Sequence, residues 1–417
     1  MSLGTKEVSM RIIGIRHRVK KTAEGEARPT QVTILENGKT TTLDLETETD
    51  ELNFVLGIFP AKTGKTETLE GLQSDDKIAM ILGGSGDNLA FALARRGQEI
   101  GATVHRIPPA VFKTVREKAG DKDAEFLAME LEKSPATFYQ VGPRDLSLIW
   151  IRECLRSRVD AMKARIACEQ RLRQHMIGAV FCSPEGKFPE GGIEKKFDDL
   201  KANDQIFKAV VAEEGKRERE LIKACEGLDV YTELFKPVVG LGPMIASRII
   251  GAVIDIRRFE TKAKLRAFCG VHLLGDGRFP RRRNNEVANW SKDCRQALYL
   301  LGDQFNRRPD SVWGKKLLEA KVKYRASHPY PVLVTNDQGN FELHEGFFKK
   351  NSNGTYNVIG RGGSHEGLKG TIRYTNGHIH KMATWYTLGK FVELLFRDWW
   401  KLEGATGKSE SGDKIEA

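Results

Sequence analysis

The segment VVGLGPMIASRIIGAV, from Val238 to Val253, sets two glycines around a leucine, follows them with a proline and continues as an apolar run. Glycine lets a backbone turn tightly and come close to a ligand. The pattern predicts a helix-hairpin-helix, in which amide N–H groups at the start of the second helix face outward and can donate to a phosphate. An ordinary turn between two packed helices is the alternative.

The residues after this turn carry the charge excess of the chain. Between Arg248 and Arg325 there are 19 Lys and Arg residues against 8 Asp and Glu, and the formal net charge of all 417 residues is +11. Concentrated positive charge favours a polyanion as partner, most simply nucleic acid. The candidate DNA contacts are the turn glycines and the basic residues that follow them: Gly240, Gly242, Arg248, Arg281, Arg282, Arg283, Lys292 and Arg295. Such binding is independent of base sequence and sensitive to salt.

Composition argues against several other classes of protein. The chain is 40% hydrophobic and 29% charged, which is typical of a globular protein with two or three domains. Its six cysteines form no CxxC pair, which argues against a zinc ribbon or a secreted disulfide scaffold and favours a cytoplasmic protein. No apolar run reaches the roughly 18 residues needed to span a bilayer, so we expect no membrane partner.

Residues 1–142 are expected to form a mixed α/β sheet. Strands are predicted at Arg11–Ile15, Gln31–Leu35, Thr40–Leu45, Lys77–Leu82 and Thr103–Ile107, with a hairpin turn at Asn37-Gly38. Helices are predicted at Asp50–Leu56, Asn88–Gly97 and Asp121–Glu132. Gly83-Gly84-Ser85-Gly86 follows the fourth strand, but it is too short a match to a dinucleotide-binding fingerprint, so turn chemistry is the preferred interpretation.

The rest of the chain is predicted to be mainly helical. Leu146–Met176 has apolar residues at helical spacing with basic residues between them, and a second helical stretch covers Ile193–Cys225. These helices form either a hairpin with solvated charges or a surface for a homo-oligomer. The expected divisions are a helical spacer at 143–232, a C-terminal helical domain at 233–330 and 371–403, a hairpin insertion at 331–370 and a disordered tail at 404–417.

A longer segment, VVGLGPMIASRIIGAVIDIRRFETKAKLRAFCGV, is similar to the C-terminal domain of the Piv/MooV-type DEDD insertion-sequence transposases, the insertion sequence 110/116/902 family. Weaker similarity continues through Asn289–Arg295 and His378–Ala383, and GDKDAEFLA at Gly120–Ala128 resembles an upstream motif of the family. The resemblance implies an RNase H-like, resolvase-like N-terminal domain, the long helical spacer and a C-terminal helix-hairpin-helix domain.

The resemblance also implies chemistry on DNA. Family members use four acidic residues that bind Mg²⁺ and a serine of the C-terminal domain that attacks DNA, and they are thought to be guided by a structured RNA. Hard divalent cations require several carboxylate oxygens, and they stabilise the charge that develops in phosphoryl transfer.

This chain departs from the family pattern at most of those positions. Arg16 stands where the first acid is expected, and Gly83–Gly86 replaces the second. Asp123 matches one acid and is the candidate metal ligand, while Asp121 can substitute for another if the loop shifts. The expected serine is missing after Gly270, and Ser291 is the nearest one. An arginine at a ligand position repels the cation.

Two functional hypotheses follow, and a third is kept beside them. The chain is either a DNA transposase or recombinase of an insertion sequence, with Mg²⁺ as cofactor if it is active, or a catalytically inactive relative that binds nucleic acid. A structural helical protein whose basic face contacts acidic protein is the remaining alternative, and it predicts no salt-dependent binding of nucleic acid.

Overall fold

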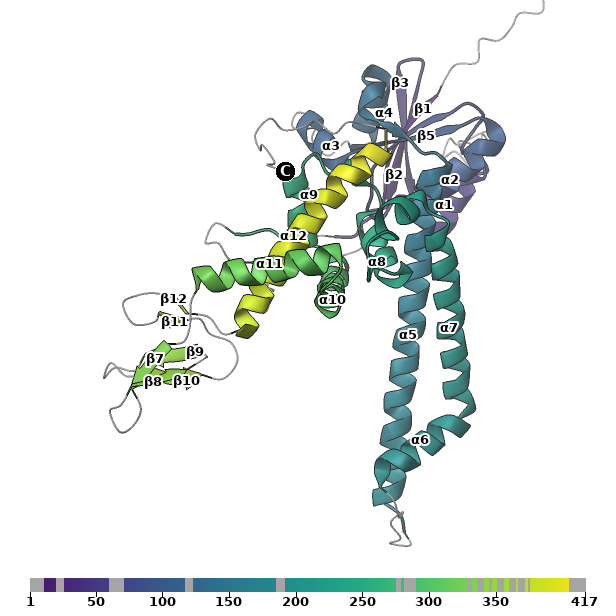
Figure 1. The fold of residues 1–417 in the computed structure, drawn as a ribbon. Helices are drawn as coiled ribbons and strands as arrows, with labels where there is room; N and C mark the ends of the chain where they lie inside the picture. The colour runs from purple at the N-terminus through teal and green to yellow at the C-terminus, as the bar shows by residue number, and fades with distance from the viewer. Residues whose placement is uncertain are drawn as a thin grey trace, which may run out of the picture. The chain divides into compact units, whose positions relative to one another are not determined.

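The computed structural model describes residues 11–19, 26–59, 71–116, 123–184, 192–274, 279–280, 290–328 and 376–404, together with the backbone of six short strands between 332 and 373. The chain divides into two compact units (Figure 1). The first comprises Met1–Leu228 and Val253–Glu260, and the second comprises Asp229–Ala252 and Thr261–Ala417. Most of the predicted spacer therefore belongs to the same unit as the N-terminal sheet. Val253–Glu260, which were predicted to lie in the C-terminal domain, belong to this unit as well.

A six-stranded mixed sheet with the order β3-β2-β1-β4-β5-β6 forms the centre of the first unit. The strands are β1 Ile12–Arg16, β2 Thr30–Glu36, β3 Lys39–Leu45, β4 Lys77–Ile81, β5 Thr103–Ile107 and β6 Tyr139–Gln140. The β2–β3 hairpin turns at Asn37-Gly38, as predicted, since both residues have positive φ. β1 runs parallel to β4, and β4 runs parallel to β5, so the chain crosses over between these strands.

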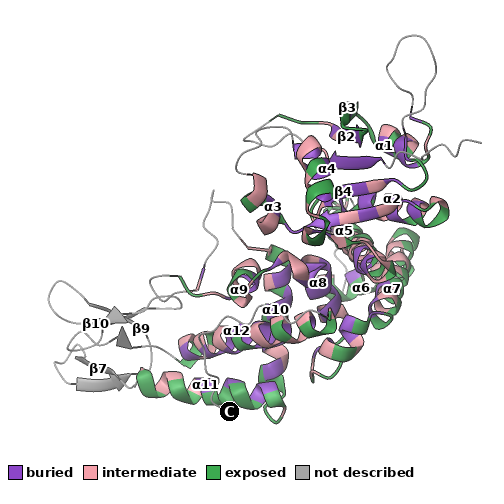
Figure 2. Cartoon of the chain, turned by 90° about the horizontal axis from the view of Figure 1, so that it is seen from above, coloured by how far each residue is buried: buried purple, intermediate pink, exposed green. Residues whose placement is uncertain are grey.

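Two hydrophobic cores cover opposite faces of this sheet. Successive side chains of a strand point to opposite faces, so Ile13 and Ile15 of β1 enter one core and Ile12 enters the other. The first core includes helices α1 (Glu48–Val55) and α2 (Asp87–Ile100). The second includes α3 (Pro109–Arg116) and α4 (Asp123–Lys133). Figure 2 shows the central strands buried between these helices. The sheet and helices confirm the mixed α/β prediction.

The long helix is partnered within the chain. α5 runs from Pro143 to Phe181, and α7, Gln205–Glu226, packs against it after the short helix α6, Ile193–Asn203. Arg158 and Arg165 of α5 form ion pairs with Glu214 of α7. The predicted second helical stretch is thus two helices, because Asp204 ends α6 and caps α7 by accepting from the Phe207 amide. The helical hairpin of the prediction is confirmed.

The second unit is mostly helical. Its elements are the π-helix η2 (Tyr231–Phe235), α8 (Pro243–Val253, which ends in the first unit), α9 (Lys262–Cys269), α10 (Lys292–Arg307), α11 (Val312–Ser327) and α12 (Asn376–Leu402). Trp399 and Phe235 meet edge to face, with ring centroids 6.2 Å apart, and both side chains are fully buried. Phe305, Trp313 and Phe391 form an aromatic cluster that joins α10, α11 and α12.

The predicted hairpin insertion consists of short strand pairs. β7 (Val332–Thr335) pairs with β8 (Phe341–His344), and β9 (Phe347–Lys350) pairs with β10 (Tyr356–Ile359). β11 (His365–Glu366) pairs with β12 (Ile372–Arg373). The predicted tail beyond residue 404 lies outside the described residues.

Candidate functional site

The positions at which acidic residues are expected from the resemblance, Arg16, Gly83–Gly86 and Asp123, lie at the end of β1, after β4 and at the start of α4. Asp123 is the first residue of α4, and its side chain is largely buried. Its Oδ1 lies 2.6 Å from Nε of Arg116, so the Arg116 guanidinium occupies the position beside this carboxylate where a metal ion would bind. α4 rests directly on β1, because a Cβ added to Gly14 would lie 1.9 Å from the Ala124 carbonyl oxygen.

These residues do not fit a Mg²⁺ site. Arg16, half-buried at the end of β1, brings a positive charge where a carboxylate is expected. Among the residues that the structure describes, no three His, Cys, Asp or Glu side chains are placed to hold one metal ion. Asp121, the other candidate acid, lies outside the described residues. Mg²⁺ requires several oxygen ligands, and Asp123, paired with Arg116, does not supply them by itself.

The Gly83–Gly86 turn is instead surrounded by arginines. Asp87, at the start of α2, accepts hydrogen bonds from Arg106 at 2.9 Å and Arg152 at 2.7 Å, and Arg152 also donates to the Gly84 carbonyl at 3.2 Å. The Arg258 side chain covers Gly83, where an added Cβ would meet its Nε at 2.8 Å. Gly83 has a φ of +83°, so glycine suits both the backbone and the close approach.

Burial sets the electrostatics of this arginine cluster, which we define as Arg106, Arg152 and Arg258. Burial raises the pKa of Asp87, while the charges of all three arginines lower it. The pKa values of Arg152 and Arg258 are themselves lowered, chiefly by burial. Asp255 also raises the pKa of Arg258, so the three arginines of the cluster face two buried carboxylates.

The predicted phosphate-binding turn lies in the second unit and has two unlike glycines. Gly240 has a φ of +91°, and an added Cβ would meet Cβ of Gln304 at 3.0 Å, so this glycine is packed against α10. Gly242 is exposed, and nothing lies within 4 Å of its added Cβ. Leu241 between them is buried and anchors the turn rather than forming its exposed tip.

The helix after the turn begins directly at the proline. α8 starts at Pro243, and the amides of Ile245 and Ala246 both donate to the Gly242 carbonyl oxygen. These two amides are therefore satisfied within the turn and do not face a ligand. Arg248 is half-buried further along α8. The element before the turn is the π-helix η2, so a full helix-hairpin-helix remains a prediction.

The other predicted contacts differ in accessibility. Lys292 is exposed at the start of α10. The Arg295 guanidinium carbon lies 4.9 Å from the ring centroid of Trp290 and 4.8 Å from that of Trp385, and burial lowers its pKa. Ser291 caps α10 by accepting from the Cys294 amide at 3.3 Å. The group formed by Arg281, Arg282 and Arg283 lies outside the described residues.

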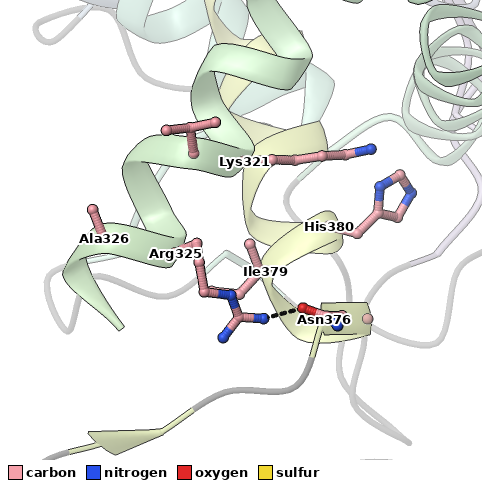
Figure 3. Close-up of a pocket in the computed structure, with 8 residues that line it drawn as sticks. Lys321, Arg325, Ala326, Asn376, Ile379 and His380 are labelled. Carbon is pink, nitrogen blue, oxygen red and sulfur yellow. Dashed lines mark hydrogen bonds between the residues drawn. The ribbon is translucent and has the colours of Figure 1, made fainter. Parts of the chain in front are cut away.

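A basic hollow between α11 and α12 was not found from the sequence. It has a volume of about 940 Å³, and its polar lining includes Lys321, Arg325, Asn376 and His380 (Figure 3). Arg325 donates to the Asn376 side-chain oxygen, and Lys321 donates to Asn306 at 2.9 Å. Burial and the charge of Lys321 lower the pKa of His380, so its ring is neutral near pH 7. The run of lysines along α11 was the only signal of this site in the sequence.

Comparison with known proteins finds one segment of the chain that is similar to a family of transposases. Residues 232–276 match a family model of transposases, and these residues form the glycine turn, α8 and α9. The model describes the Transposase IS116/IS110/IS902 family, which the chain resembles over these residues. The resemblance predicted from the sequence is thereby confirmed. No curated protein matches the chain.

Part of the matched segment lies in the first unit. Arg257 of the 3-10 helix η3 (Ile256–Arg258) forms ion pairs with Asp255 and Asp145, and it lies 4.5 Å from the Tyr139 ring centroid. The next residue, Arg258, covers Gly83. The segment Asp255–Phe259, within the matched residues, therefore contacts the Gly83–Gly86 turn through Arg258. No helix in the described part of the chain has the length and apolar character that crossing a bilayer requires.

Proposed function

We propose that this insertion-sequence transposase binds DNA through the basic helices of its second unit. The observation that carries the proposal is the family match at residues 232–276, followed directly by the most basic part of the sequence. The open Gly242 allows a phosphate backbone to approach the turn. The contact with DNA is expected to be largely independent of base sequence.

α11 supplies the exposed cations for this proposal. Lys315, Lys316 and Lys323 are exposed, and none of the three is in an ion pair with the described acidic residues. Lys316 and Lys323 lie over the rings of Trp313 and Tyr386, at 4.6 and 5.4 Å from the centroids, which holds their stems in place. Such lysines attract phosphates without distinguishing bases.

Equilibrium binding to a fluorescent DNA duplex tests this proposal. We expect a variant with Lys315→Glu, Lys316→Glu and Lys323→Glu to bind at least 10-fold more weakly, because each change replaces an attractive charge by a repulsive one. The matched control replaces Lys195, Lys196 and Lys216 by glutamate. These exposed lysines lie on α6 and α7 of the first unit, and their replacement gives the same change in net charge. Equal loss in both variants would show that only the total charge matters.

DNA transposition and recombination are the expected activity, and a catalytically inactive, nucleic-acid-binding relative is the alternative. The ion pair of Asp123 with Arg116 and the position of Arg16 favour the alternative as far as Mg²⁺-dependent cleavage is concerned. A strand-cleavage assay with Mg²⁺ distinguishes the two. Activity that Asp123→Ala abolishes would support the family's metal-dependent reaction, and DNA binding without cleavage would support the inactive relative.

A structured guide RNA and a homo-oligomer built on the long helices complete the proposal. Trp150 and Phe181 of α5 and Ile206 of α7 are exposed apolar side chains on the helical hairpin, which a second copy of the chain can cover. Sequencing of the nucleic acid that purifies with the protein tests for a guide RNA, and light scattering measures the oligomeric state. Recovery of only random fragments would argue against RNA guidance.

A further inference from the structure

A serine, a histidine and a carboxylate lie in series at the edge of the sheet where β1 and β4 end. Ser85 Oγ is 2.9 Å from His17 Nδ1, and His17 Nε2 is 3.4 Å from Glu51 Oε1. The three residues come from the Gly83–Gly86 turn, from the residue after β1 and from α1. A hydroxyl next to an imidazole that a carboxylate orients is the arrangement that activates a serine nucleophile.

The carboxylate of this triad is held firmly. Glu51 is buried and accepts hydrogen bonds from Arg18 Nη2 at 2.8 Å and from Thr30 Oγ1 at 2.5 Å. The backbone amide of Arg18 in turn donates to Thr30 Oγ1 at 2.9 Å. Because Glu51 cannot move freely, it favours the tautomer of His17 that carries its proton on Nε2. Nδ1 is then the acceptor that faces Ser85 Oγ at 2.9 Å, the shorter of the two contacts of this hydroxyl, since the Arg18 carbonyl oxygen lies 3.5 Å away.

Burial lowers the pKa of His17, while Glu51 raises it to a smaller extent. The ring is therefore neutral near pH 7 and can take a proton.

The glycines of the turn make this approach possible. A Cβ at Gly86 would lie 3.1 Å from Cβ of His17 and 3.3 Å from Cε of Met80, so a larger residue would displace the histidine. Gly84 has a φ of +98°, which side-chain-bearing residues rarely adopt. Ser85 itself is exposed, so a large substrate can reach its hydroxyl.

The charges around the turn select the class of substrate. Arg18 is paired with two carboxylates, Glu48 and Glu51, whereas the three arginines of the cluster all act on Asp87. Arg152 is partly exposed and is tied to the Gly84 carbonyl, directly beside Ser85. Arginine stabilises the charge of a phosphate and of its transition state. A neutral carboxylic ester would gain little from these cations.

We propose that Ser85 is the nucleophile that attacks a DNA phosphodiester, with His17 as its general base and Glu51 as the residue that orients His17. This inference rests on the proposed action on DNA. In the step, Ser85 Oγ forms a bond to phosphorus while the bond from phosphorus to one deoxyribose oxygen breaks. The hydroxyl proton passes to His17 Nδ1, and the departing deoxyribose oxygen takes a proton from water, so the products are a phosphoserine diester and a free strand end.

A fluorophosphonate probe tests the nucleophile without any DNA. Its phosphorus is attacked by activated serines with loss of fluoride, and peptide mass spectrometry locates the adduct. We expect labelling of Ser85 in the wild-type chain, none at this position in Ser85→Ala, and labelling about 100-fold slower in His17→Gln. Ser147→Ala is the matched control, since Ser147 is also exposed in the first unit but donates only to the Pro143 carbonyl.

A DNA duplex with a bridging phosphorothiolate at its cleavage positions tests the substrate class, because loss of the sulfur leaving group traps the covalent adduct. We expect a peptide from Ser85 joined to DNA, and faster turnover of bis(4-nitrophenyl) phosphate than of 4-nitrophenyl acetate. Adducts spread over other serines, or labelling of Ser85 that is unchanged in His17→Gln, would overturn the proposal. Turnover of the acetate alone would overturn the substrate class.

The probe and the DNA-binding assay distinguish an activated serine from DNA binding. If the chain does not bind DNA but the probe labels Ser85, the proposed function fails and the activated serine stands. If the chain binds DNA but neither reagent reaches Ser85, the nucleophile fails and the binding function stands. Thermal unfolding of each variant, compared with the wild type, shows that lost labelling reflects chemistry rather than misfolding.

Discussion

Replacement of Asp87 by asparagine is expected to destabilise the first unit strongly. Asp87 and Arg106 are each only 2% exposed, and their side chains meet at 2.9 Å. Arg152 of α5 binds the other oxygen of the Asp87 carboxylate, at 2.7 Å. Asparagine removes the negative charge and leaves the Arg106 guanidinium buried without it, which costs about 3–5 kcal/mol. In a unit of this size such a loss lowers the Tm by about 6–20 °C.

Hydrogen exchange of β4 and β5 peptides, combined with calorimetry, measures this loss in the first unit itself. Glu99→Gln is the matched control, because Glu99 also lies on α2 and pairs with an arginine, Arg96, but both side chains are exposed. We expect that change to stay within about 0.5 kcal/mol. The double variant with Asp87→Asn and Arg106→Met should be less destabilised than Asp87→Asn alone, since it removes the buried charge. A cost for Asp87→Asn no larger than the control would refute the reasoning.

Two further predictions concern the backbone and pH. Gly240→Ala should lower the unfolding free energy of the second unit by about 1–3 kcal/mol, because Gly240 has a positive φ and packs against Gln304. Gly242→Ala, the matched control, should change it little. Equal effects of the two substitutions in urea unfolding would contradict this. Burial raises the pKa of Asp76 to about 6 despite the ion pair with Arg11. A raised pKa means that this carboxyl stabilises the fold below about pH 4 and loses that contribution as the pH rises through 6, by about 3 kcal/mol. Asp76→Asn should remove this part of the pH dependence, and an unchanged pH profile would count against it.

Local patterns predicted most of the secondary structure. Asn37-Gly38 specifies a hairpin turn by itself, and the strand at Thr103–Ile107 has the predicted bounds. The short helix after β3 begins at Glu48 rather than Asp50, because Thr47 is its N-cap and Asp50 completes the capping box. The chemistry of capping was visible in the sequence, but the choice between neighbouring caps depended on the backbone.

The candidate site was much less predictable than the fold. Ser85 and His17 are 68 residues apart, and only the parallel pairing of β1 with β4 brings their strand ends together. The burial of Arg295 between two tryptophans likewise depends on α12, which lies far along the chain. Charge in the sequence indicated a nucleic-acid partner, but it did not show which arginines are used in packing.

The salt dependence of DNA affinity tests the central claim most directly. We expect the logarithm of the association constant to fall linearly with the logarithm of the salt concentration between about 50 and 200 mM. The slope should be smaller by about 3 in the variant with glutamate at Lys315, Lys316 and Lys323, because about one phosphate contact is lost with each lysine. A slope that the α11 changes leave untouched, or affinity that does not respond to salt at all, would contradict binding of DNA by this surface.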